Sequence, residues 1–320
     1  MEIDKVNIWL DCDVGNDDAM AIILGLFDPK SNLLGISSCF GNTSLENCTN
    51  NTLRILSSVG RSDIPVFKGA ESSLKSVRVT TTAHGKQGLF EADRLIKTFE
   101  PVQNISLYDL MKKTAGDRKF VIVITGPQTN IAILLRDHPD IIPQIQEIIF
   151  MGGTSGFGNA TPNAEYNIYS DPEAAQYVID TCKKHKLKLV MIALDLTYTC
   201  LVVEEQQKRI KEINTKFTDW CLEMLKEFQE AYKAEEFDYP PLHDPVALFY
   251  ALHPELYVTK SIFVTVECES KLCYGRTVVD KHGILELEPT LEFCRSVNVE
   301  EFWNHMIEAV KQAAKNSKIE

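Results

Sequence analysis

Short apolar runs alternate with amphipathic stretches along the first two thirds of the chain. Nearly continuous apolar runs predict buried strands at residues 6–10, 33–40, 120–125, 147–151 and 187–194. Apolar residues at helical spacing predict helices at residues 19–26, 45–59, 129–137, 172–185 and 204–230. Apolar strands separated by helices are typical of a parallel sheet that is covered on both faces. The pattern therefore predicts an α/β fold with a Rossmann-like, mostly parallel sheet.

The last third of the chain has a different pattern. Closely spaced apolar runs at residues 262–267, 274–279 and 285–288 predict short strands joined as hairpins, and residues 299 to about 315 predict a closing amphipathic helix. We therefore expect a mixed or antiparallel edge on the sheet. Because no repeat, low-complexity linker or strong boundary divides the sequence, we expect residues 1–320 to form a single domain.

Four carboxylates occupy one short turn after the first predicted strand: Asp11, Asp13, Asp17 and Asp18. Side chains alternate along a strand, so Asp11 and Asp13 should point to the same side, and Gly15 permits the turn into the helix. A helix dipole of about half a charge cannot offset four clustered carboxylates. A hard divalent cation with oxygen ligands fits the group best. Since ligands bind at the carboxyl ends of strands in open α/β sheets, we expect a metal or ligand site here.

Two long loops are expected, at residues 69–90 and 152–170. Long loops in compact folds are usually functional or disordered. The second loop contains Asn159, Glu165 and Asn167. Amides beside a carboxylate suit a polyol, whose hydroxyls both donate and accept hydrogen bonds.

Composition narrows the possible partners. The formal net charge is −12 and no basic run is present, which argues against a nucleic-acid partner. No apolar stretch is long enough to span a bilayer, and residues 1–5 do not begin a secretory signal, so no membrane partner is expected. The nine Cys are scattered and suit a reducing compartment. We expect a cytoplasmic protein that acts on a small molecule.

Further polar motifs follow the predicted strands, and the series resembles the inosine-uridine preferring nucleoside hydrolase family. The family signature Asp-x-Asp-x-Gly-x-Asp-Asp matches residues 11–18. Other matches spread over essentially the whole chain: Gly41-Asn42, Thr125-Gly126-Pro127, Met151-Gly152-Gly153, Ala164-Glu165-Tyr166-Asn167 and His243-Asp244-Pro245. Two positions depart from the family pattern. Val14 stands where the family usually has Pro, and Gln87 stands where it often has Asp, which bears on contacts with the base.

The resemblance implies a calcium-dependent enzyme that hydrolyses the N-glycosidic bond of ribonucleosides to ribose and free base. Such a reaction would pass through a calcium-bound water and an oxocarbenium-like transition state, and it would serve nucleoside catabolism and the salvage of purines and pyrimidines. The family also implies a homo-oligomer, a homodimer or a homotetramer.

Site residues follow from the resemblance by position. The ligands of Ca²⁺ would be Asp13, Asp18, the backbone carbonyl of Thr125, and Asp244. The residues that hold the ribose would be Asp17, Asn42, Asn159, Glu165, Asn167 and Asp244. Asp13 would be the general base, His243 would lie near the leaving base, and His84 would contact the base. His84 favours pyrimidine nucleosides, whereas His243 beside Asp244 resembles the type with broad preference, so base preference stays open.

The chemistry of the reaction suits these residue types. Cleavage of a glycosidic bond builds positive charge on the sugar, which carboxylates and amides around the ribose stabilise. The leaving base needs a proton, which asks for an acid such as His. Tyr232, Phe237 and Tyr239 precede His243 and can either stack on the base or pack in the core.

Three alternatives are weighed against this interpretation. Phosphatases of the haloacid dehalogenase type also carry Asp-x-Asp, but their motif requires Thr or Val where Gly15 stands. An EF-hand loop that starts at Asp11 should end in Glu where Ile22 stands. A non-catalytic nucleoside- or calcium-binding protein would tolerate the replacement Asp13→Asn, whereas an enzyme should lose turnover by orders of magnitude.

Overall fold

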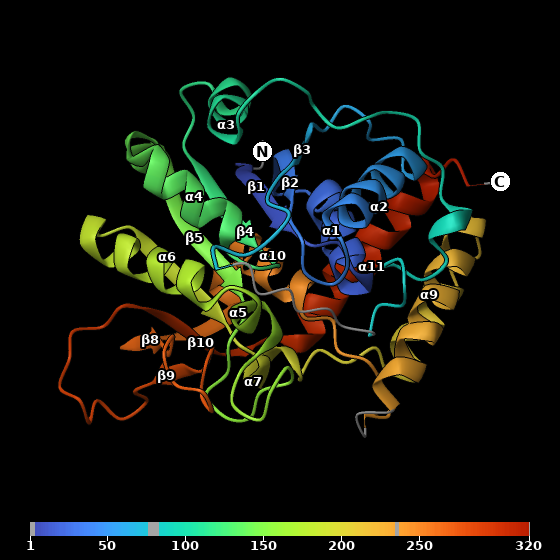
Figure 1. Ribbon diagram of the computed structural model, residues 1–320. Coiled ribbons are helices and arrows are strands. Elements are labelled where there is room, and N and C mark those ends of the chain that lie inside the picture. The colour runs from blue at the N-terminus through green and yellow to red at the C-terminus, as the bar shows by residue number, and fades with distance from the viewer. Residues whose placement is uncertain (1–3, 76–82, 234–236, 320) are drawn as a thin grey trace.

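The computed structural model describes residues 4–75, 83–233 and 237–319 (Figure 1). Its centre is an eight-stranded sheet with the strand order β3-β2-β1-β4-β5-β6-β10-β7. The strands are β1 (Val6–Cys12), β2 (Ser31–Ser38), β3 (Val66–Lys68), β4 (Phe120–Ile124), β5 (Ile145–Met151), β6 (Lys188–Ile192), β7 (Tyr257–Ile262) and β10 (Leu291–Val297). Every neighbouring pair is parallel except β10 and β7, which are antiparallel. The expected α/β fold, with a mostly parallel sheet and an antiparallel edge, is confirmed.

Helices cover both faces of the sheet. They are α1 (Asn16–Phe27), α2 (Leu45–Ser58), α3 (Leu107–Ala115), α4 (Thr129–Asp137), α5 (Tyr166–Ser170), α6 (Pro172–His185), α7 (Leu194–Thr197), α8 (Glu204–Lys211), α9 (Lys216–Lys233), α10 (Asp244–Leu252) and α11 (Val299–Asn316). Along β1, Ile8 and Leu10 belong to one core, together with α1, α2 and α9–α11, whereas Trp9 belongs to a second core with α3, α4 and α6. This alternation explains why β1 is apolar at nearly every position.

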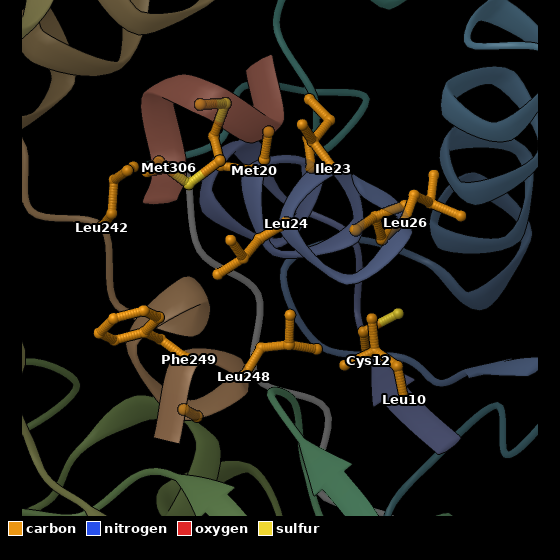
Figure 2. Packing of buried hydrophobic residues seen from close by; sticks show 14 of the residues in the cluster. Leu10, Cys12, Met20, Ile23, Leu24, Leu26, Leu242, Leu248, Phe249 and Met306 are labelled. Carbon is orange, nitrogen blue, oxygen red and sulfur yellow. The ribbon is translucent and has the colours of Figure 1, made fainter. Parts of the chain in front are cut away.

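α1 is packed between α10 and α11. Figure 2 shows Leu24 of α1 directed toward Leu248 of α10, and Met20 of α1 beside Met306 of α11. All four side chains are buried. Close packing of this kind sets the position of α1 relative to its neighbours, and so the positions of the side chains at its ends.

Two expected elements are wrong. The single helix at 204–230 is two helices, α8 and α9, because Asn214 between them adopts a left-handed backbone conformation with φ 56°. Residues 285–288 form no strand. The Asp280 carboxylate accepts the backbone N–H groups of Ile284 and Leu285, which holds this segment in a turn. The strand lies a few residues later, as β10, and the expected hairpin is reduced to a small antiparallel pair, β8 (Val264–Val266) with β9 (Thr277–Val279).

In the described part of the chain, no helix combines the length and the apolar character needed to cross a membrane. The single-domain organisation, the oligomeric state and the cytoplasmic location stay predictions.

Candidate active site

A pocket opens at the carboxyl edge of the sheet, where polar residues follow several strands. It encloses about 550 Å³ of space, part of which is open to solvent. Its walls are formed by Asp17, Asn42, Ala83, His84, Thr125, Met151, Asn159, Glu165, Tyr166, Asn167, Tyr232, His243 and Asp244. These residues come from widely separated parts of the sequence, and the strand ends and helix starts bring them together.

Three carboxylates meet at one side of this pocket. Asp17 and Asp18 lie in the first turn of α1, and Asp244 begins α10. One carboxylate oxygen of each lies within 4.8 Å of the others, and all three side chains are buried. Burial, followed by repulsion from Asp17 and Asp18, raises the pKa of Asp244 well above its usual range. The pKa values of Asp17 and Asp18 are raised for the same first reason.

Asp13 is a fourth buried carboxylate and interacts with Asp18 and Asp17 of this triad. Its Oδ2 accepts the backbone N–H of Asn42 at 2.7 Å, whereas its Oδ1 has no hydrogen-bond partner among the described residues. Burial and the nearby Asp18 raise the pKa of Asp13 well above its usual range. A Cβ atom on Gly126 would lie only 2.7 Å from Asp13 Oδ1, so the glycine backbone passes very close to the carboxylate.

The donor atoms fit a hard divalent cation. In the part of the chain that the structure describes, no Lys or Arg forms an ion pair with Asp13, Asp17, Asp18 or Asp244. Asp17 Oδ1, like Asp13 Oδ1, has no hydrogen-bond partner there. Buried carboxylates require either protons or a cation, and an all-oxygen set suits Ca²⁺ or Mg²⁺. The triad includes Asp17, which the sequence comparison assigns to the ribose.

Thr125 links the carboxylates to the other wall of the pocket. Its hydroxyl donates to Asp18 Oδ1 at 2.7 Å, and its carbonyl accepts Asn167 Nδ2 at 2.8 Å. Asn42 Nδ2 donates to Asp18 Oδ2 at 3.3 Å. These bonds orient Asn42, Thr125 and Asn167 before any ligand enters.

Glu165 holds the loop that follows β5 through hydrogen bonds to its backbone. Its carboxylate accepts the backbone N–H groups of Gly153, Asn167 and Ile168 at 2.7–3.0 Å, and so caps α5. Burial raises the pKa of Glu165 to about 7 in spite of these bonds. Asn159 is fixed in the same loop, since its Oδ1 accepts the backbone N–H of Tyr166 at 2.9 Å.

Two buried histidines lie on the wall beside the carboxylates. His84 Nδ1 accepts the backbone N–H of Asn16 at 3.0 Å, so the proton of the neutral ring resides on Nε2. Burial lowers the pKa of His84 to about 4. The ring packs against Phe228 with 5.2 Å between centroids. His84 is therefore a neutral donor rather than a cation.

His243 is held between two hydroxyl groups. Thr197 Oγ1 lies 2.6 Å from its Nδ1, and Tyr232 Oη lies 2.9 Å from its Nε2. Burial, assisted by the nearby His84, lowers the pKa of His243 to about 3. The ring is neutral at physiological pH, and a proton on it can be exchanged with the Tyr232 hydroxyl.

Nine of the eleven site residues expected from sequence line the pocket, and the other two, Asp13 and Asp18, accept hydrogen bonds from the lining residues Asn42 and Thr125. Of the aromatic candidates, Tyr232 lines the pocket, whereas Phe237 stacks on Tyr198 at 4.9 Å. Sequence reasoning did not assign a role to Ala83, Met151 or Tyr166. Met151 and Tyr166 lie inside motifs that match the family, and these matches could have identified them as site residues.

Comparison with known proteins finds similarity along nearly the whole chain. The family model described as inosine-uridine preferring nucleoside hydrolase matches residues 8–304. The pyrimidine-specific ribonucleoside hydrolase RihA of Escherichia coli O1:K1 / APEC is 37% identical over 309 residues, which cover 95% of this chain and 98% of that protein. The solved structure of a purine-preferring ribonucleoside hydrolase from Gardnerella vaginalis superposes with a TM-score of 0.87 at 29% identity, covering 97% of this chain and 99% of the other. A plant nucleoside hydrolase, the PpNRh1 enzyme, gives a TM-score of 0.85 at 25% identity, covering 96% and 99%.

Proposed function

Because the chain belongs to the inosine-uridine preferring nucleoside hydrolase family, it is a ribonucleoside hydrolase that cleaves an N-glycosidic bond, and we propose that it prefers pyrimidine ribonucleosides. The observation that carries the proposal is one pocket in which a buried carboxylate triad adjoins two neutral histidines and the Tyr232 hydroxyl. Similarity over nearly the whole chain to a relative described as pyrimidine-specific supports the base preference.

Ca²⁺ is the proposed cofactor. Asp13, Asp18, Asp244 and the Thr125 carbonyl would hold the ion, and Asp17 is a further candidate ligand because it belongs to the triad. When bound, the ion would supply positive charge that orients the attacking water and two adjacent ribose hydroxyls. The oxygen-only donor set and the carboxylate oxygens that lack partners in the described chain support this choice.

Asp13 is the proposed general base. Its Oδ2 is occupied by the Asn42 N–H, which fixes the carboxylate, and its Oδ1 is the oxygen that would accept a proton from water. Because Ca²⁺ acidifies a bound water only modestly, a carboxylate held beside that water would supply the base that the reaction needs.

The wall formed by Asn42, Asn159, Glu165 and Asn167 is proposed to hold the ribose. Amide and carboxylate groups can bind each hydroxyl as donor and acceptor, and the carboxylate together with the amide oxygens stabilises the positive charge that builds on the ring. Because these side chains are already hydrogen-bonded to the backbone or, for Asn42, to Asp18, little reorganisation is needed when the substrate binds.

The histidine wall is proposed to receive the leaving base. His84 would donate its Nε2 proton to a base oxygen or nitrogen, since its Nδ1 is held by Asn16. Tyr232 would donate from its hydroxyl, and His243 would exchange the proton at Nε2. Neutral donors of this kind stabilise the negative charge of a departing base without a cationic acid.

A substrate panel tests the proposal. Release of ribose would be measured from uridine, cytidine, inosine, guanosine and 2′-deoxyuridine, with calcium and after stringent chelation. We expect uridine and cytidine to exceed the purine nucleosides, the deoxy analogue to react weakly, and chelation to abolish turnover. Higher kcat/KM on inosine than on uridine would overturn the pyrimidine assignment. Undiminished turnover in the chelated protein would overturn the metal assignment.

A further inference from the structure

A second group of metal-ligating side chains lies at the opposite ends of the helices that begin at the pocket. Asp28 follows the last residue of α1, His253 follows the last residue of α10, and His305 lies on α11. With 12 residues in α1, this group is about 18 Å from the start of the helix. Among the residues that the structure describes, this group and the pocket triad are the two clusters that could hold a metal ion.

The three side chains point at one another. Asp28 Oδ2 lies 3.1 Å from His253 Nε2 and 2.7 Å from His305 Nδ1. Asp28 and His253 are buried, whereas the His305 side chain is 28% exposed and leaves a route from solvent. Both rings therefore hydrogen-bond to the same carboxylate oxygen, and the three ligand atoms lie within 4.8 Å of one another, so a small ion that enters would replace these two hydrogen bonds.

Neighbouring groups orient these ligands. The backbone N–H of Lys30 donates to Asp28 Oδ1 at 2.9 Å, which turns Oδ2 toward the histidines. The second nitrogen of His253 lies 3.7 Å from Glu255 Oε1, beyond hydrogen-bond distance, and that oxygen is paired with Lys30 Nζ at 2.9 Å.

The histidine rings are also fixed by packing. The Phe249 ring contacts both of them, with centroid distances of 4.8 Å to His253 and 5.4 Å to His305. Figure 2 shows Phe249 beside Leu248 under α1. Rigid placement reduces the entropy that the ligands lose when an ion binds, which favours binding.

We propose that Asp28, His253 and His305 form a second divalent metal site that takes Zn²⁺ or a similar transition ion in preference to Ca²⁺. Imidazole nitrogen suits these ions, whereas Ca²⁺ prefers oxygen alone. Two histidines and one carboxylate provide three protein ligands and leave a fourth position for water. The proposal does not depend on the proposed function, because it concerns a different donor set at the other end of the helices.

An ion at this site would join the helices that supply the pocket carboxylates. α1 carries Asp17 and Asp18 at its first turn, and α10 carries Asp244 (Figure 1). Both helices end at the proposed site, where α11 adds the third ligand. We infer that the ion stabilises the mutual position of the three helices and takes no part in the reaction.

Zinc binding to the full-length protein tests the proposal. Saturating calcium would first occupy the oxygen site, and zinc would then be titrated by calorimetry, with metal content measured after desalting. The test variant is His305→Ala, and His185→Ala, at an exposed helical histidine, is the matched control. We expect one zinc per chain in the parent and the control, and about 100-fold weaker binding or more in His305→Ala. The melting temperatures of the parent and of His185→Ala should rise by about 4 °C when zinc is at about 100 times its dissociation constant. Equal zinc affinity in all three proteins, or no binding to the parent, would overturn the proposal.

A second measurement needs no variant and so does not depend on how His305→Ala folds. Diethyl pyrocarbonate would modify exposed histidines in the calcium-loaded parent, and peptide mass spectrometry would report His305 and His185 separately. We expect zinc to protect His305 by at least about tenfold while His185 reacts as before. Bound zinc that leaves His305 fully reactive would overturn the assignment, even if the calcium site and the hydrolase activity are intact.

Discussion

Replacement of Asp13 by Asn is the sharpest test of the proposed base. The Asn side chain has the same shape, so its carbonyl can keep the 2.7 Å bond from the Asn42 N–H. Its amide group then occupies the position of Oδ1 and cannot accept a proton. Loss of a general base costs roughly 100- to 10,000-fold. We expect kcat on uridine to fall by about 1000-fold, with the fold intact.

Asp11→Asn is the matched control, since it also removes one buried carboxylate, near the carboxyl end of the same strand. Asp11 accepts hydrogen bonds from Ser37 and from Asn130 Nδ2, and it does not line the pocket. Burial raises its pKa from 3.8 to about 7. We expect the activity of this variant to stay within about tenfold of the parent.

The control also carries a stability prediction whose sign follows from that pKa. A raised folded-state pKa stabilises the fold fully below pH 3.8, and this contribution is lost as pH rises through about 7. The rise of about 3 in the pKa of Asp11 corresponds to about 4 kcal/mol of stability that the parent loses at high pH. A buried Asn amide without a hydrogen-bond partner destabilises the variant by roughly 1–3 kcal/mol. In the absence of metal, the free energy of unfolding of Asp11→Asn should therefore exceed that of the parent by about 1–3 kcal/mol at pH 8.5. At pH 3.5 it should be lower than that of the parent.

Initial rates on uridine and urea unfolding of the metal-free proteins would be measured side by side. Turnover of Asp13→Asn within tenfold of an active parent would refute the base assignment and favour another carboxylate as the base. No turnover by the parent itself would favour a binding protein. Equal losses in Asp11→Asn and Asp13→Asn would show that loss of either carboxylate is enough to disturb the site.

Three further predictions concern the same site. Gly126→Ala places a Cβ 2.7 Å from Asp13 Oδ1, so kcat should fall by roughly 100-fold, whereas Gly156→Ala, with its nearest atom at 3.7 Å, should be silent in the same rate assay. Tyr232→Phe removes the hydroxyl 2.9 Å from His243, and kcat should fall by about 10- to 100-fold with little change in KM; an unchanged kcat would exclude Tyr232 from proton transfer. Calcium affinity should rise with pH by up to about tenfold per unit for each proton displaced, because burial raises the pKa values of Asp17, Asp18 and Asp244. Calorimetry in buffers of different ionisation enthalpy would count the protons released. An affinity that does not change between pH 5.5 and 7.5 would contradict this prediction.

Local sequence was enough for elements whose pattern and boundaries agree. α4 and α6 have the predicted boundaries, and α6 begins with Asp171 capping the helix and Pro172 in its first turn. β10 was missed, because Arg295 and Ser296 interrupt its apolar pattern and its place inside the sheet depends on distant strands. The break between α8 and α9 depends on the backbone conformation of one residue, which periodicity does not reveal.

The same distinction holds for the site. The carboxylates, amides and histidines could be named because they lie in motifs that follow strands. The hydrogen-bond partners of His243 could not be named from sequence. Thr197 is 46 residues away, and Tyr232 lies near the end of α9, whose position depends on helix packing. The neutral state of both histidines likewise follows from burial, which no motif encodes.

The position of β10 has a consequence for how the protein is made. Among the strands that the structure describes, β10 comes last in the sequence, yet it lies between β6 and β7. Until residues 291–297 have left the ribosome, both of those strands keep an unpaired edge, which is a known hazard for aggregation. α11 emerges later still, and only then can it cover α1. A nascent chain therefore keeps α1 uncovered until residues 299–316 have emerged, and a stop codon shortly before β10 should yield an insoluble product although every proposed pocket residue has already been translated.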